Sequence, residues 1–147
     1  MGTPEATWRL AGTGDVNADG TADLVWRDNT GDLVVWNFNK DSSHTGGDLG
    51  HVDTAFQIVG VGDFSGDGIS DLLWRNVNNG DLVSWDMKPD GSRTGFDFGV
   101  VDPSFKVVDI GDYNGDGERD ILWRNTWTGD VVTWDMNDPP TRVLTSA

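Results

Sequence analysis

An internal repeat is the feature that most limits how this chain can fold. An acidic, glycine-rich loop occurs three times, as DVNADGTAD from Asp15, DFSGDGISD from Asp63 and DYNGDGERD from Asp112, at spacings of 48 and 49 residues. Each copy continues into an apolar segment that ends in Trp-Arg (DLVWR, DLLWR, DILWR). A glycine-containing turn and a second apolar segment follow (GDLVVWNF, GDLVSWDM, GDVVTWDM). Repeats of this length are structural units that bury apolar surface against their neighbours. The sequence therefore predicts three similar modules.

The apolar pattern of the repeat predicts an all-β fold. No stretch places apolar residues at helical spacing over three turns, and the apolar segments are short and separated by turns rich in Asn and Gly. A period near 48 residues, built from several short strands, favours the blades of a β-propeller over the units of a helical solenoid. We expect one unit over residues 1–147, with three four-stranded blades at about 8–55, 56–104 and 105–147. The outer strand of each blade is expected near 48–52, 96–101 and 142–145.

Alternation along the second apolar segment predicts which side chains face the core. Val83, Trp85 and Met87 share one face of their strand, which we expect to point inward, and Leu82, Ser84 and Asp86 share the opposite face. The preceding segment is apolar on both faces, as expected for a strand between neighbouring layers. The third copy follows the same pattern, with Val132, Trp134 and Met136 expected to point inward and Thr133 and Asp135 outward.

The three loops predict metal binding. Side-chain oxygens occupy positions one, three, five and nine of each loop, and glycine occupies position six. Hard divalent cations prefer such oxygen ligands, and calcium fits best. An EF-hand is excluded because it needs a bidentate glutamate at position twelve and flanking helices, whereas Trp26, Trp74 or Trp123 stands there. Asp-Gly turns without metal are the alternative, which three repetitions of one oxygen pattern disfavour. Because each loop joins two strands of one blade, we expect calcium to stabilise the fold rather than to regulate it.

Two of the copies resemble a known repeat family. GDFSGDGISDLLWRN and GDYNGDGERDILWRN resemble the FG-GAP, or VCBS, repeats of integrin-α-type β-propellers, and TGDVVTWDM is similar to the version in secreted and surface proteins of bacteria. The resemblance covers nearly the whole chain, and it implies one calcium ion per loop, three Ca2+ per chain. Ser65 matches the pattern least well, so the middle site is expected to bind least tightly. The side-chain ligands that the resemblance implies are Asp15, Asn17, Asp19 and Asp23, then Asp63, Ser65, Asp67 and Asp71, then Asp112, Asn114, Asp116 and Asp120. The backbone carbonyls of Thr21, Ile69 and Glu118 would complete the three sites.

The net charge excludes some partners and fits the metal hypothesis. The chain has 10 basic and 25 acidic residues and a net charge of −15, and nine of the acidic residues are the loop aspartates. Three calcium ions would cancel six negative charges, so much of the acidity is metal-binding capacity. No basic patch is available to neutralise phosphates, which argues against nucleic acid as a partner. The chain has no cysteine for a disulfide or a thiolate zinc site, and no apolar run near the ~18 residues of a membrane span.

The calcium hypothesis also predicts a location. Loops of this kind fill readily where calcium is millimolar, so we expect a secreted or cell-surface, extracellular protein of bacterial type. The first residues, MGTPEATW, lack the basic and apolar regions of a signal peptide. Any export signal is therefore expected to be absent or already removed.

Catalytic residues are not expected. The chain has two glutamates, Glu5 and Glu118, no cysteine nucleophile, and two histidines, His44 and His51, without counterparts in the other copies. Paired carboxylates occur in the loops, where calcium would occupy them. We therefore expect that the protein is not an enzyme, and that the segment with both histidines is a solvated surface loop.

The tryptophans and the Trp-Arg arginines are expected to be mainly structural. Six of the eight tryptophans occupy two equivalent positions per copy and are expected to pack in the core. Trp127 stands at a turn where the other copies carry polar residues, so exposure or contact with a partner is expected there. Arg27, Arg75 and Arg124 are expected to make hydrogen bonds between blades or to pair with turn aspartates. The candidate turn aspartates are Asp32, Asp81 and Asp130.

The number of copies predicts self-association. Closed propellers use about four to eight blades, whereas this chain encodes three. Two apolar sheet faces would stay open and invite association, so either the native protein is longer or several chains close one ring. Two copies give six blades, and we expect a homodimer.

The expected function follows from the resemblance. It implies a calcium-stabilised, non-catalytic binding or adhesion module that holds a glycan or protein ligand with the loops of one face. One alternative is a purely structural or engineered propeller fragment that assembles into a closed ring, and another is a sugar-binding propeller lectin. The loops differ between copies, which weakens the lectin alternative because repeated lectin sites reuse their side chains.

Overall fold

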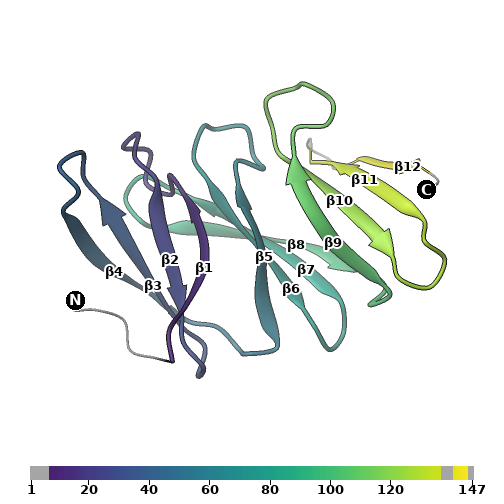
Figure 1. Ribbon diagram of the computed structural model, residues 1–147, viewed down its shortest axis with the longest axis horizontal. Helices are drawn as coiled ribbons and strands as arrows, with labels where there is room; N and C mark the ends of the chain where they lie inside the picture. The colour runs from purple at the N-terminus through teal and green to yellow at the C-terminus, as the bar shows by residue number, and fades with distance from the viewer. Residues whose placement is uncertain (1–6, 137–140, 146–147) are drawn as a thin grey trace.

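The protein forms three four-stranded antiparallel β-sheets (Figure 1). The computed structural model describes residues 7–136 and the backbone of 141–145. The first sheet contains β1 (Arg9–Gly14), β2 (Asp23–Arg27), β3 (Asp32–Phe38) and β4 (His44–His51). The second contains β5 (Phe56–Gly62), β6 (Asp71–Asn76), β7 (Asp81–Met87) and β8 (Arg93–Val100). The third contains β9 (Phe105–Gly111), β10 (Asp120–Asn125), β11 (Val131–Asp135) and β12 (Thr141–Thr145). These described residues include no helix, and hence none that could span a membrane.

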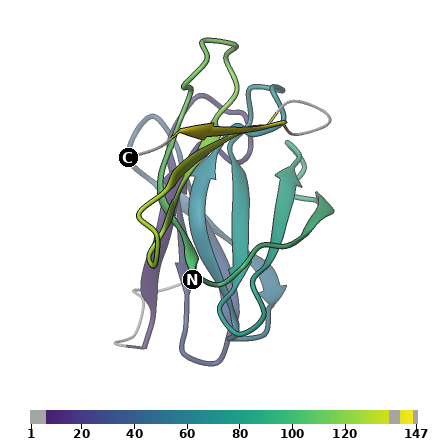
Figure 2. The same ribbon diagram turned by 90° about the vertical axis from the view of Figure 1, so that its right-hand side faces the viewer.

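Each sheet is a simple meander, because its strands follow one another in chain order. The first strands of the sheets, β1, β5 and β9, contact one another in succession, so the sheets stand side by side in a row (Figures 1 and 2). The predicted all-β fold with four strands per copy is confirmed. The three sheets fit the arrangement of blades in a propeller.

The outer strands begin earlier than predicted in the first two sheets. Strand β4 begins at His44 rather than near residue 48, and β8 begins at Arg93 rather than near residue 96. The added residues are polar or glycine (His44, Thr45, Gly46 and Gly47; Arg93, Thr94 and Gly95). Gly46 lies opposite Trp36, and Gly95 lies opposite Trp85. Periodicity of side chains therefore could not locate these ends.

Two hydrophobic cores lie between the sheets. Val25, Leu33 and Val35 of the first sheet pack against Leu72 and Trp74 of the second. In the same way, Leu73 and Leu82 of the second sheet pack against the third sheet, and the third-sheet partners are Ile121, Trp123, Val132, Trp134 and Met136. The inward set predicted for the third copy is confirmed.

The outward assignment of Leu82 and Ser84 is wrong, because both side chains are buried. The middle sheet is covered on both faces, so either parity along β7 meets a neighbouring sheet. On the other face, Met87 is buried and Trp85 is partly buried. Alternation along a strand separates its two faces but does not show that one of them is solvated.

The repeated tryptophans pair across β2–β3, β6–β7 and β10–β11. The ring centroids of Trp74 and Trp85 lie 4.9 Å apart, and equivalent pairs in the other sheets lie 5.4 and 5.2 Å apart. Trp74 is buried, whereas Trp26 and Trp36 are half-buried because no sheet precedes the first one within the described residues. The predicted core role therefore holds fully in the third sheet and partly in the other two. Trp127 is 88% exposed.

Candidate metal centres

The three acidic loops connect the first and second strands of each sheet, and all lie at the same edge of the row (Figure 1). In each loop three carboxylates offer oxygen atoms that lie within 4.8 Å of one another. The three triads consist of Asp15, Asp19 and Asp23; Asp63, Asp67 and Asp71; and Asp112, Asp116 and Asp120. The structure therefore brings together positions one, five and nine of every predicted site, close enough to hold one metal ion.

The position-one carboxylate organises the turn of its loop. Asp63 accepts hydrogen bonds of 2.8 Å from the backbone N–H groups of Gly66 and Gly68, and Asp112 does the same in the third loop. Gly68, at position six, has a φ of +83°, a conformation that side chains with a Cβ rarely adopt. The glycine at position six is thus required by the fold of the loop.

The position-nine aspartates are buried and link the loop to a distant strand. The Asp71 carboxylate accepts hydrogen bonds of 3.0 Å from the N–H groups of Phe64, in the loop, and Met87, at the end of β7. Asp23 and Asp120 make the equivalent pairs of bonds. Burial raises the pKa of all three carboxyls, that of Asp71 to about 7. A divalent cation would supply the positive charge that these buried carboxylates lack.

The position-three residues make different contacts in the three loops. Asn17 accepts a hydrogen bond from the Asp19 N–H through Oδ1 and donates one to the Asp19 carboxylate, both at 3.1 Å. Asn114 likewise accepts from the Asp116 N–H. The Ser65 hydroxyl lies at 3.5 Å from the Asp63 carboxylate, which is long for an O–H donor. The weaker middle match predicted from the sequence stays a prediction.

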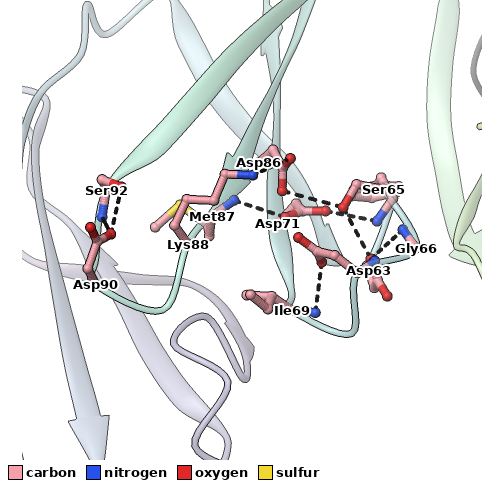
Figure 3. A network of polar contacts seen from close by, with 12 residues as sticks. Asp63, Ser65, Gly66, Ile69, Asp71, Asp86, Met87, Lys88, Asp90 and Ser92 are labelled. Atoms are coloured by element: carbon pink, nitrogen blue, oxygen red, sulfur yellow. Dashed lines mark hydrogen bonds and ion pairs between the residues drawn. The ribbon is translucent and has the colours of Figure 1, made fainter.

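A fourth carboxylate approaches two of the loops from the neighbouring hairpin. Asp86, on β7, lies 3.4 Å from the Ser65 hydroxyl (Figure 3). In the third sheet Asp135, on β11, accepts a 2.6 Å hydrogen bond from Asn114. Lys88 donates to Asp86 at 2.9 Å, and this hydrogen bond raises the pKa of the lysine. The sequence prediction missed both aspartates. The repeated Trp-Asp-Met motif was the available signal, but its distance from the loop along the chain concealed the contact.

The three residues predicted to ligate through the backbone also lie in the loops. Thr21, Ile69 and Glu118 donate their N–H groups to the position-five aspartate, at 2.9 Å in each case. Ligation by their carbonyl oxygens stays a prediction. The Glu118 side chain reaches the second loop, where its Oε1 lies 2.6 Å from the position that a Cβ on Gly66 would take.

The Trp-Arg arginines connect neighbouring sheets. Arg27 donates at 2.8 Å to the backbone carbonyls of Val52 and Asp53, in the link to the second sheet, and also donates to Phe56. Its guanidinium lies 5.0 Å from the ring centroid of Trp74. Arg75 repeats this arrangement toward the third sheet. The predicted contact between blades is confirmed for both arginines, and the predicted pairing with Asp32 and Asp81 is wrong, since carbonyls take the guanidinium hydrogen bonds instead.

The two histidines lie at the ends of β4. His44 stacks on Trp36 with ring centroids 4.3 Å apart, and His51 lies 2.9 Å from the Asp32 carboxylate. Both are exposed, although they belong to a strand rather than to the predicted loop.

Comparison with known proteins identified no relative: no family model, no curated protein and no solved structure matches the chain.

Proposed function

We propose that the protein is a calcium-stabilised, non-catalytic binding module of the FG-GAP/VCBS propeller class, secreted or displayed at a cell surface. The proposal that calcium binds rests on the carboxylate triad, which occurs in all three loops and includes a buried aspartate at position nine. All the ligand atoms on offer are oxygens, which favours calcium over metals that prefer nitrogen or sulfur. Three carboxylates within one coordination sphere repel one another until a cation binds.

The position of the triads favours a structural role for calcium. Each buried aspartate ties the first loop of its sheet to the end of the third strand. A bound ion would therefore fix three strands of one sheet together. Binding to the folded state alone adds RT ln(1 + [L]/Kd) to stability at each site.

Thermal unfolding with calcium, with magnesium and with a chelator tests this role. We expect a calcium-dependent rise in Tm that chelator reverses and magnesium reproduces poorly, with three ions bound per chain by calorimetric titration. Asp120→Asn should remove one ion, and Asp130→Asn, at the far turn of the same sheet, should remove none. Equal Tm values with calcium and chelator would refute the proposal.

The binding role rests on the resemblance and on one surface groove. A groove of about 300 Å³ lies beside the middle loop, between the second and third sheets, and is lined by Phe64, Ser65, Asp86, Phe96 and Glu118, among others. Phe96 is exposed and lies 4.7 Å from Phe98, ring centroid to centroid. Aromatic rings beside carboxylates can stack on a sugar and accept its hydroxyl hydrogen bonds.

A glycan array probed with and without calcium separates a binding module from a scaffold. Reproducible binding that Phe96→Ser abolishes supports a sugar-binding, lectin-like module with the groove as its site. Absence of binding to any glycan or surface protein favours the structural alternative, a self-assembling unit. We propose for either case that two copies associate into a six-bladed ring, as the three blades of one chain imply.

A further inference from the structure

Within the described residues, the first and third sheets each leave one face uncovered. Each uncovered face corresponds to one side of the contact that neighbouring sheets make within the chain. In both contacts between sheets, the face that carries the Trp-Arg arginine packs against the tryptophan face of the next sheet. The first sheet keeps its tryptophan face open, which we call the head face: Leu10, Trp26, Trp36 and Phe38. The third sheet keeps its arginine face open, which we call the tail face: Val108, Tyr113, Leu122, Arg124 and Val131.

Arg124 has the same place in its sheet as two arginines that already make the contact. The guanidinium of Arg75 lies 4.8 Å from the ring centroid of Trp123 and donates to the Phe105 carbonyl at 3.0 Å. Arg75 is buried, whereas Arg124 is exposed. By repeat position, the partners of Arg124 are the Trp26 ring and the Trp8 carbonyl, and both lie at the opposite end of the row.

Apolar residues on the two faces are exposed only where the next sheet is missing. Val16 and Phe64 follow the first loop aspartate and are 3% and 5% exposed, whereas the equivalent Tyr113 is 46% exposed. On the head face Leu10 is 51% exposed, whereas its equivalents Ile58 and Val107 pack against the cores. A sheet seated on each face would bury both residues.

The first strands of the first and third sheets, β1 and β9, depart from the repeat at positions that would face each other in such a contact. A Cβ on Gly12 would lie 2.3 Å from Val61, and a Cβ on Gly60 would lie 2.8 Å from Ile110. The third copy carries Asp109 at the glycine position, and the first copy carries Thr13 at the aliphatic position. If the tail face of one copy packs on the head face of another, Asp109 and Thr13 lie opposite each other. The Thr13 hydroxyl can then donate a hydrogen bond to the Asp109 carboxylate.

We propose that the tail face docks on the head face of a second copy of this chain, with Arg124 stacked over Trp26 of that copy. The contact continues the packing already seen twice within one chain. It rests on the propeller assembly proposed above and makes the contact head-to-tail, between different surfaces. Two such contacts close a dimer of six blades, within the range of known rings. A rotation that does not close would instead give a filament.

Sedimentation velocity in calcium tests the proposal. We expect a particle of twice the 16.0 kDa chain mass. Arg124→Glu and Leu10→Glu should each weaken the association by at least tenfold, on the order expected for a central interface residue. Lys40→Glu makes the same charge change as Arg124→Glu at the exposed turn between β3 and β4 and should leave the mass unchanged.

A mixture of the two interface variants tests the direction of the contact. Each variant keeps one intact face, so an equimolar mixture should form a mixed dimer with a single contact at concentrations where either weakened variant alone is monomeric. A monomeric wild-type protein, or dimers unaffected by either substitution, would overturn the proposal. Both substitutions lie outside the loops, so the variants should keep the calcium-dependent rise in Tm. A dimer without a calcium response would count against the calcium role alone.

Discussion

The backbone N–H of Ser70 donates a 2.8 Å hydrogen bond to the carbonyl oxygen of Asp15, and Arg119 makes the same bond to Asp63. Position eight of each following loop is thus tied to position one of the loop before it, in the neighbouring sheet. The first residues of the first and second candidate sites are therefore hydrogen-bonded to the backbone of the next site. The loops therefore connect neighbouring sheets as well as strands of one sheet, which goes beyond the role predicted from the sequence.

Calcium binding at the first two loops should therefore be coupled. Asp15→Asn should abolish binding at the first loop and weaken binding at the second by about fivefold, the low end of measured coupling between sites. Asp112→Asn gives an internal control, because the Arg119 bond to Asp63 ties the third loop to the second loop and not to the first. It should remove the third site, weaken the second to a similar degree because coupling is reciprocal, and leave the first unchanged. Calorimetric titration of dilute protein measures this, and an unchanged second site in Asp15→Asn would contradict coupling.

The middle site should bind calcium more tightly when a carboxylate replaces the Ser65 hydroxyl at position three. Ser65→Asp adds a carboxylate near Asp63, and we expect calcium affinity at this site to rise by about tenfold, because ligand charge tunes calcium affinity. Asn78→Asp adds the same charge at the exposed turn between β6 and β7, at the other end of the sheet. Its affinity should match the wild type. Equal affinities in the two variants would mean that position three does not ligate.

The sequence predicted the strands and loops that recur, because three copies of one pattern reveal which positions the fold constrains. It could not predict contacts between segments that meet only in three dimensions. Asp86 and Asp135 were read as part of an outward strand face, yet the hairpin returns them to the loop. Leu82 was misassigned because alternation along a strand does not show what covers either face. Arg75 reaches its carbonyls only because the chain crosses to the next sheet 26 to 30 residues later.

The stability of the calcium-free protein should fall as pH rises. Burial raises the pKa of Asp71 to about 7 in the folded state, against about 3.9 in an unfolded chain. Between these values the folded protein holds a proton on Asp71 that the unfolded chain has lost, so the contribution of this carboxyl to stability is fully present below about pH 4 and declines toward pH 7. Calcium needs the ionised carboxylate and should remove this decline. Urea unfolding across this pH range in chelator measures the effect.

Asp71→Asn is the control for the pH dependence. It keeps the shape of the side chain and removes the titrating group, so the slope of stability against pH should become clearly shallower. Asp53→Asn removes an exposed carboxylate at the link between the first two sheets and should leave the slope unchanged. A calcium-free protein that becomes more stable from pH 4 to pH 7 would contradict the assignment.

Arg75 and Arg124 provide a matched pair for the energy of one contact between sheets. Arg75 is buried against Trp123 and donates to three backbone carbonyls, whereas Arg124 is exposed in the single chain. Arg75→Met should lower the free energy of unfolding by about 2–4 kcal/mol, because it removes a desolvated cation–π contact and leaves carbonyls unpaired. Arg124→Met should change it by less than about 0.5 kcal/mol in dilute monomer. At concentrations where the protein associates, the Arg124 variant should lose stability relative to wild type, since the head face of a second copy then takes the place of the missing sheet. Equal losses from both substitutions in dilute monomer would show that the arginines stabilise their own sheet rather than the contact with the next one.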